Sequence, residues 1–87
     1  MIRVRFAGHI RTSMGTEEVE IPVDGVSVGD LMGLLLSKKP VGLDHGFTKY
    51  NTLVVVNDEE AFSASSKEKR QIRDGDSVLL VPFSHGG

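Results

Sequence analysis

The sequence predicts an α+β domain in which one main helix packs across a mixed β-sheet of four to five strands. Apolar and polar residues alternate at 2–6, as in a strand that buries one face, and the apolar run 78–81 indicates another strand near the other end of the chain. Between these segments, residues 28–35 place apolar side chains at the i, i+3, i+4 and i+7 spacing of a helix. A chain of 87 residues is long enough for one small domain.

The first two elements are predicted to form an antiparallel hairpin. Apolar residues alternate with polar ones over 2–6 and again over 18–23, which is typical of half-buried strands. Pro22 has no N–H to donate, so the second strand should lie or end at a sheet edge. Opposite charges would share one face of the hairpin: Arg3, Arg5, Glu18 and Glu20. The intervening residues 7–16 are interpreted as a turn or loop.

The central helix has clear start and stop signals. Ser27 is expected to cap it, with Asp30 in the first turn beside the positive end of the helix dipole. Pro40 is expected to stop it, and two basic residues suit its negative end. The predicted buried stripe and these basic residues are Val28, Leu31, Met32, Leu35, Lys38 and Lys39.

The C-terminal half supplies the other strands. Residues 41–51 are expected to be a loop, and the apolar run 53–56 a central strand. There follow a turn at 57–60, a short return strand at 61–62, a surface connection at 63–70, the core residue Ile72, a turn at 74–76 and a last strand at 77–82. With the second strand at an edge, the first and last strands should pair in parallel at the centre. This is the β-grasp arrangement of ubiquitin-like proteins.

Composition excludes several functions. Without cysteine, the chain has no disulfide, thiolate metal site or cysteine nucleophile of its own. The net charge is −2 with no basic cluster, so no nucleic-acid partner is expected. No apolar run approaches a membrane span, and residues 1–20 lack the apolar segment of a signal peptide. We therefore expect a cytoplasmic protein with no membrane partner.

The sequence also lacks the motifs of a self-contained active site. His9, His45 and His85 have no metal-ligand spacing, and there is no nucleophile elbow or phosphate-binding loop. The acidic run 58–60 is interpreted as a solvated turn. We expect the chain to bind no metal or cofactor itself, and not to be an enzyme.

We expect the chain to divide into a domain at 1–82 and a flexible tail at 83–87, which ends in Gly86 and Gly87. Two glycines allow the backbone to enter a narrow channel, with His85 and Gly86 as the approach. The reactive group would be the α-carboxylate of Gly87. Adenylation by ATP would convert it into a mixed anhydride, which a sulfur nucleophile could attack with AMP as the leaving group.

An apolar row leads to this tail. Leu79, Val81 and Phe83 fall on the face of the last strand opposite Val78 and Leu80. An exposed apolar row beside a reactive group indicates a docking patch for a partner. The alternative is that a loop or the other side of the sheet covers it.

Several segments together resemble a known family. They are IRVRFA at 2–7, VSVGDL at 26–31, VVVN at 54–57 and DGDSVLLVP at 74–82, and the terminal Gly-Gly is the most specific. In these segments, which span nearly the whole chain, the sequence resembles the ubiquitin-like sulfur carriers: MoaD, ThiS, the ubiquitin-related modifier and the small archaeal modifier proteins.

The resemblance implies a β-grasp carrier whose Gly87 is adenylated by a ubiquitin-activating-type enzyme. That partner would supply the ATP site and Mg²⁺, and a sulfurtransferase would supply sulfur. The product would be a thiocarboxylate, a conjugate with protein lysines, or both.

Two alternatives stay open. The N-terminal half resembles MoaD, the small subunit of molybdopterin synthase, which would bind the large subunit and donate sulfur to a pterin precursor. Phe83 stands where MoaD tails have a second proline, and His85-Gly86-Gly87 is similar to the end of the ubiquitin-related modifier, which favours the modifier. The alternative from another class is a non-reactive β-grasp interaction module.

Overall fold

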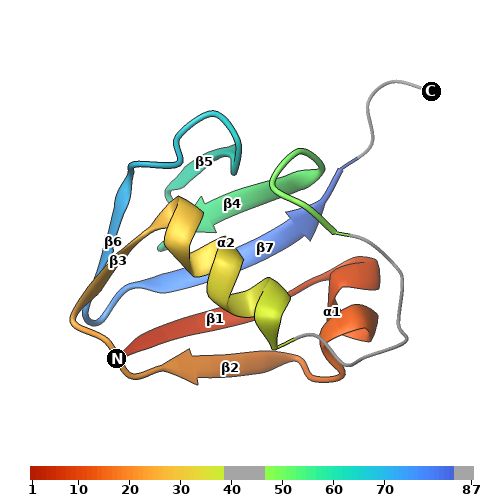
Figure 1. The fold of residues 1–87 in the computed structure, drawn as a ribbon, viewed down its shortest axis with the longest axis horizontal. Helices are drawn as coiled ribbons and strands as arrows, with labels where there is room; N and C mark the ends of the chain where they lie inside the picture. The colour runs from red at the N-terminus through yellow and green to blue at the C-terminus, as the bar shows by residue number, and fades with distance from the viewer. Residues whose placement is uncertain (39–46, 84–87) are drawn as a thin grey trace.

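The computed structural model describes residues 1–38 and 47–83, and it shows a sheet with a helix lying across it (Figure 1). The elements in chain order are β1 (Ile2–Phe6), α1 (Gly8–Met14), β2 (Glu18–Ile21), β3 (Gly25–Ser27), α2 (Val28–Ser37), β4 (Thr52–Val56), β5 (Glu60–Ser63), β6 (Gln71–Arg73) and β7 (Ser77–Pro82). Five strands form one mixed sheet in the order β2-β1-β7-β4-β5, and β3 pairs with β6 in a second sheet. The predicted α+β fold is confirmed.

The first and last strands pair in parallel, with β7 at the centre of the sheet, as predicted. Val4 lies opposite Val78 and Phe6 opposite Leu80, and all four side chains are buried. The hairpin of β1 and β2 is antiparallel, with β2 at the edge. Its predicted charge pairing is present, because Arg3 Nε lies 3.5 Å from Glu18 Oε2.

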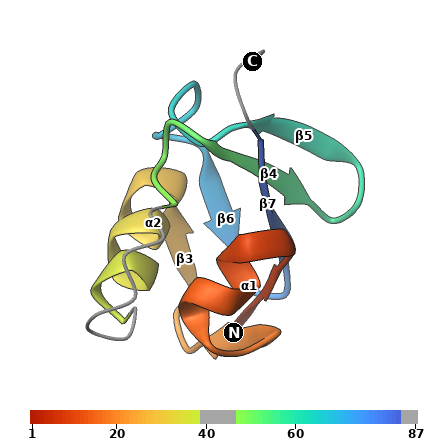
Figure 2. The same cartoon turned by 90° about the vertical axis from the view of Figure 1, so that its right-hand side faces the viewer.

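The helix α2 covers one face of the sheet, as Figure 2 shows from the side. Ser27 caps it as expected, since its Oγ accepts a hydrogen bond from the Asp30 N–H at 3.1 Å. The predicted stripe is buried in full: Val28, Leu31, Met32 and Leu35. Lys39, Pro40 and part of the predicted loop, 41–46, lie outside the described residues. Neither helix of the described chain is long and apolar enough to cross a membrane.

The interpretation of residues 7–16 as a turn or loop is wrong, because α1 occupies most of this segment. Ile10 and Met14, one helical turn apart, are both buried in the core. A seven-residue helix is too short to be stable alone in water, so this one depends on tertiary packing.

The three-residue strands β3 and β6 were also not predicted, although Ile72 in β6 is the buried core residue expected.

The turn between β4 and β5 is tied to the start of β7 through Asn57. Its amide Nδ2 donates to Asp76 Oδ1 at 3.0 Å, and its Oδ1 accepts from the Ser77 N–H at 2.9 Å. Asn57 has a left-handed φ of 53°, a conformation that asparagine tolerates better than most residues. The Arg73 N–H and the Asn57 amide, which both donate to Asp76, lower the pKa of that carboxyl.

Replacing Asn57 with glycine should remove these side-chain hydrogen bonds while keeping the left-handed backbone accessible. We expect the free energy of unfolding to fall by about 1–3 kcal/mol at neutral pH, measured by urea denaturation. Folding lowers the Asp76 pKa, so the ionised Asp76 side chain stabilises the folded protein at every pH above the ordinary aspartate pKa of about 3.9. This stabilisation is lost as the pH falls through the pKa that Asp76 has in the folded protein. The difference in free energy of unfolding between the native protein and Asn57→Gly should therefore become smaller in acid.

Asp58→Gly is the matched control, since Asp58 also has a left-handed φ, of 58°. Its side chain pairs with Arg5 at 4.0 Å and is 83% exposed, so the substitution should cost little. Equal losses in the two variants, or a deficit of Asn57→Gly that does not change with pH, would contradict this account.

Candidate functional site

The candidate site lies on the face of the five-stranded sheet opposite α2. Along β7, Leu79 and Val81 alternate with the buried Val78 and Leu80. In the neighbouring β4, Val55 pairs with Leu79 and Leu53 pairs with Val81. These four half-buried residues are here called the outer patch: Leu53, Val55, Leu79 and Val81. No helix of the described chain covers this face (Figure 2).

The outer patch is bordered by charged residues toward β2. Arg5 lies beside Leu79 in the parallel register, and Arg3 beside Ser77. Arg5 pairs with Asp58 at 4.0 Å and Arg3 with Glu18 at 3.5 Å, in both cases with exposed side chains. Such exposed pairs contribute little stability, but charges at the rim of an apolar surface orient a partner during association. The face thus has an apolar half toward Pro82 and a charged half toward the start of β7.

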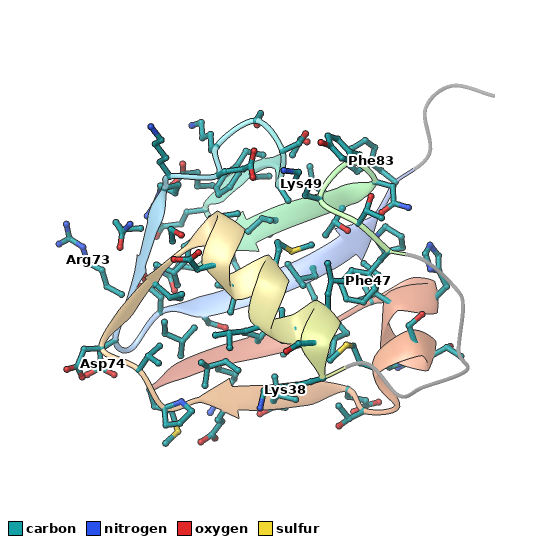
Figure 3. The ribbon with its side chains drawn as sticks, in the orientation of Figure 1. Lys38, Phe47, Lys49, Arg73, Asp74 and Phe83 are labelled. Carbon is teal, nitrogen blue, oxygen red and sulfur yellow. The ribbon has the colours of Figure 1, made fainter. Side chains whose placement is uncertain are left out.

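Phe83 stands at the end of β7, beside the loop that carries Lys49 (Figure 3). Its side chain is half-buried, and its N–H donates to the Asn51 carbonyl at 3.0 Å. The loop adds the exposed Tyr50, whose ring centroid lies 5.3 Å from Lys49 Nζ. Lys49 also donates to Glu68 at 2.9 Å, and this carboxylate raises the lysine pKa. The Glu68 carboxylate thus favours the charged form of the Lys49 side chain.

The structure brings part of the predicted site together. Leu79 and Val81 share one face, as their alternation predicts, and Phe83 follows them at the end of the same strand. His85, Gly86 and Gly87 lie outside the described residues. The contributions of Leu53 and Val55 were missed, because the run 53–56 is apolar throughout and gives no sign of which side chains face outward.

The described residues contain no group of three or more histidine, cysteine, aspartate or glutamate side chains able to hold a metal ion. His9 is exposed on α1, whereas His45 and His85 are outside the described part of the chain. The face opposite α2 is thus an apolar surface with a charged border.

Comparison with known proteins identifies the fold. No family model and no curated relative matches the sequence. Among solved structures, the chain is similar to SAMP1 from Haloferax volcanii, with 22% identity, a TM-score of 0.68 and coverage of 99% of this chain and 98% of that one. It is also similar to a putative molybdopterin converting factor, subunit 1, from Pyrococcus furiosus, with 21% identity, a TM-score of 0.66 and coverage of 95% and 97%.

A third similar structure is from the BexX/CysO complex of Amycolatopsis orientalis, with 21% identity, a TM-score of 0.67 and full coverage of both chains. These similarities extend over nearly the whole length of each chain. They show that this protein has the ubiquitin-like β-grasp fold, the one predicted from the order of its strands and helix.

The two faces of β7 should respond differently to truncation. Leu80→Ala removes a side chain that is 0% exposed and should lower the free energy of unfolding by about 2–5 kcal/mol. Leu79→Ala, one residue away on the half-buried outer face, should cost about 1 kcal/mol because much less apolar area is lost. Chemical denaturation of both variants measures the difference. Similar losses would mean that the outer face is packed as tightly as the core.

Proposed function

We propose that this protein is a ubiquitin-like sulfur carrier and protein modifier that acts through the carboxylate of Gly87. In this proposal the chain is a substrate rather than a catalyst. A ubiquitin-activating-type enzyme binds the outer patch together with Phe83 and supplies the ATP site and Mg²⁺. A sulfurtransferase then provides sulfur, or a lysine of a target protein provides the acceptor amine.

The observation that carries this proposal is the continuity of β7 with the tail. One strand presents the half-buried Leu79 and Val81 on a face that no described helix covers and leads through Phe83 to the Gly-Gly sequence at 86–87. A partner docked on the outer patch is thereby placed close to the segment that it would modify. The β-grasp fold shared with SAMP1, a small archaeal modifier protein, supports the proposal, and the similar structure from the BexX/CysO complex supports docking to a partner.

The proposed chemistry balances without a catalytic group from this chain. A carboxylate oxygen of Gly87 attacks the α-phosphorus of ATP, and pyrophosphate leaves. Hydrosulfide then attacks the carbonyl carbon of the acyl adenylate and AMP leaves, giving the thiocarboxylate. If the sulfur arrives as a persulfide, a thiol must afterwards cleave the S–S bond of the acyl disulfide. In conjugation, a lysine amine attacks the activated carbonyl instead, loses a proton and forms an isopeptide.

The alternative is the small subunit of a molybdopterin synthase, which the similarity to a putative molybdopterin converting factor supports. That role requires a stable heterodimer with a large subunit and transfer of sulfur to a pterin precursor. Size-exclusion chromatography of the protein from its own cells would show such a heterodimer. Target proteins carrying the peptide 74–87 on lysine after trypsin digestion, which cuts last at Arg73, would instead show the modifier.

Deleting Gly87 should abolish ATP-dependent adenylation, measured as pyrophosphate exchange with the activating enzyme, because the reacting carboxylate is displaced by one residue. Thermal stability should be unchanged, since the buried core comes from residues 2–80. In the intact protein from its own cells, the thiocarboxylate would add about 16 Da, as one oxygen is replaced by sulfur. Adenylation retained in the deletion variant would refute the carrier role and favour the plain interaction module.

Val81→Asp should weaken docking of the activating enzyme by placing a charge in the outer patch, where it must be desolvated. We expect KM for the carrier to rise about tenfold or more with little change in kcat. Leu34→Asp is the matched control, because Leu34 is an exposed leucine of α2, on the other side of the sheet. If both variants are activated as well as the native protein, the outer patch is not the docking surface.

A further inference from the structure

The end of β7 is held from the side of β4. Pro82 pairs with Thr52 in the antiparallel register, and Thr52 is fully buried. The next residue, Phe83, donates its N–H to the Asn51 carbonyl at 3.0 Å. Backbone pairing with β4 therefore continues one residue beyond the strand itself.

Asn51 is in turn fixed by the turn that precedes β4. Its side-chain Oδ1 accepts from the Thr48 N–H at 2.7 Å and from the Thr52 hydroxyl at 3.4 Å. Its own N–H donates to the Thr48 carbonyl at 3.2 Å. The turn begins beside Phe47, which is 1% exposed. The carbonyl that receives the Phe83 N–H thus belongs to an anchored turn.

The opposite side of β7 is held by the start of α1. Ala7 donates its N–H to the Leu80 carbonyl at 3.0 Å, and the chain then turns into the helix at Gly8 with a φ of 57°. A Cβ on Gly8 would lie 2.8 Å from Pro82 Cγ and 3.3 Å from Pro82 Cδ. Only glycine allows this close packing of α1 against the proline ring. Figure 1 shows α1 and the end of β7 at the same end of the sheet.

We infer that the contact of Gly8 with Pro82 and the hydrogen bond from Phe83 to Asn51 form a clamp that fixes where and in which direction the tail leaves the domain. This inference rests on the proposed function and deepens it, by assigning Gly8 and Asn51 as positioning residues for activation of Gly87. Four residues follow Phe83, and fully extended they span at most about 14 Å. In this proposal, an enzyme that acts on Gly87 holds its ATP site within that distance of the surface that contacts Phe83.

Gly8→Ala tests the clamp, and Gly15→Ala is its matched control. Both glycines lie at an end of α1 with positive φ, but a Cβ on Gly15 meets no described atom within 4 Å. The two variants should share the cost of backbone strain, whereas only Gly8→Ala pushes on Pro82. Hydrogen exchange of the Phe83 amide should accelerate about tenfold or more in Gly8→Ala and stay near the native rate in Gly15→Ala.

Activation provides the second measurement. With the activating enzyme, Gly8→Ala should lower kcat for adenylation about ten- to a hundredfold, because a misplaced carboxylate rarely reaches the reactive geometry. KM should change much less than kcat, because the four residues of the outer patch are intact and only Phe83 of the proposed docking surface is loosened. Adding Pro82→Ala to Gly8→Ala removes the ring atoms that the new methyl group would strike. The double variant should therefore recover part of the protection of the Phe83 amide from exchange and part of the lost kcat. Asn51→Ala, which loosens the other side of the clamp, should produce the same pattern as Gly8→Ala.

Equal exchange of the Phe83 amide in Gly8→Ala and Gly15→Ala would overturn the clamp. So would rapid exchange of that amide in Gly8→Ala with an unchanged kcat. If the native protein is not adenylated at all, the proposed function fails, while the exchange measurement still decides whether the clamp exists. Where Gly8→Ala does not fold, the exchange and kinetic measurements on Asn51→Ala decide instead.

Discussion

The parallel pairing of β1 with β7 is the constraint on which the rest of this structure depends. It joins the two ends of the described chain at the centre of the sheet, with Val4 opposite Val78 and Phe6 opposite Leu80. Parallel neighbours cannot be joined by a tight turn, so everything between them must return across or around the sheet. α2 does so over one face, and the remaining strands of the main sheet add outward, β2 on one side and β4 and β5 on the other.

This pairing also determines which side chains form the outer patch. Because β7 has a hydrogen-bonded neighbour on each side, its alternation is fixed, and the pleat that buries Val78 and Leu80 turns Leu79 and Val81 outward. The register with β4 adds Leu53 and Val55 beside them. An apolar surface on a central strand with two hydrogen-bonded neighbours is organised in advance, which would lower the entropic cost of the proposed docking.

The short helix α1 connects the fold with the proposed function. Its apolar residues Ile10 and Met14 add to the core, and its first residue, Gly8, lies against Pro82, where the sheet gives way to Phe83. Under the proposed function, the reacting end of the chain has to be presented to the activating enzyme at a defined place. In this protein the elements that could define that place are α1 and the turn before β4, one on each side of β7.

The sequence alone was sufficient for the features set by local chemistry and period. These are the capped helix at Ser27 with its buried stripe, the alternating strand at 2–6, and the edge position that follows from Pro22. Each of these features can be predicted from residues that are close together in the sequence, without knowledge of any long-range contact.

Only the tertiary structure decided the rest. α1 is too short to be stable by itself, and it forms because Ile10 and Met14 find a core to enter. The run 53–56 is apolar on both faces, so its pairing with β7, and not its pattern, assigned Leu53 and Val55 to the outer patch. The packing of Gly8 on Pro82 joins residues far apart in the chain. Such contacts are invisible in a sequence, because they exist only after long-range pairing has brought their partners together.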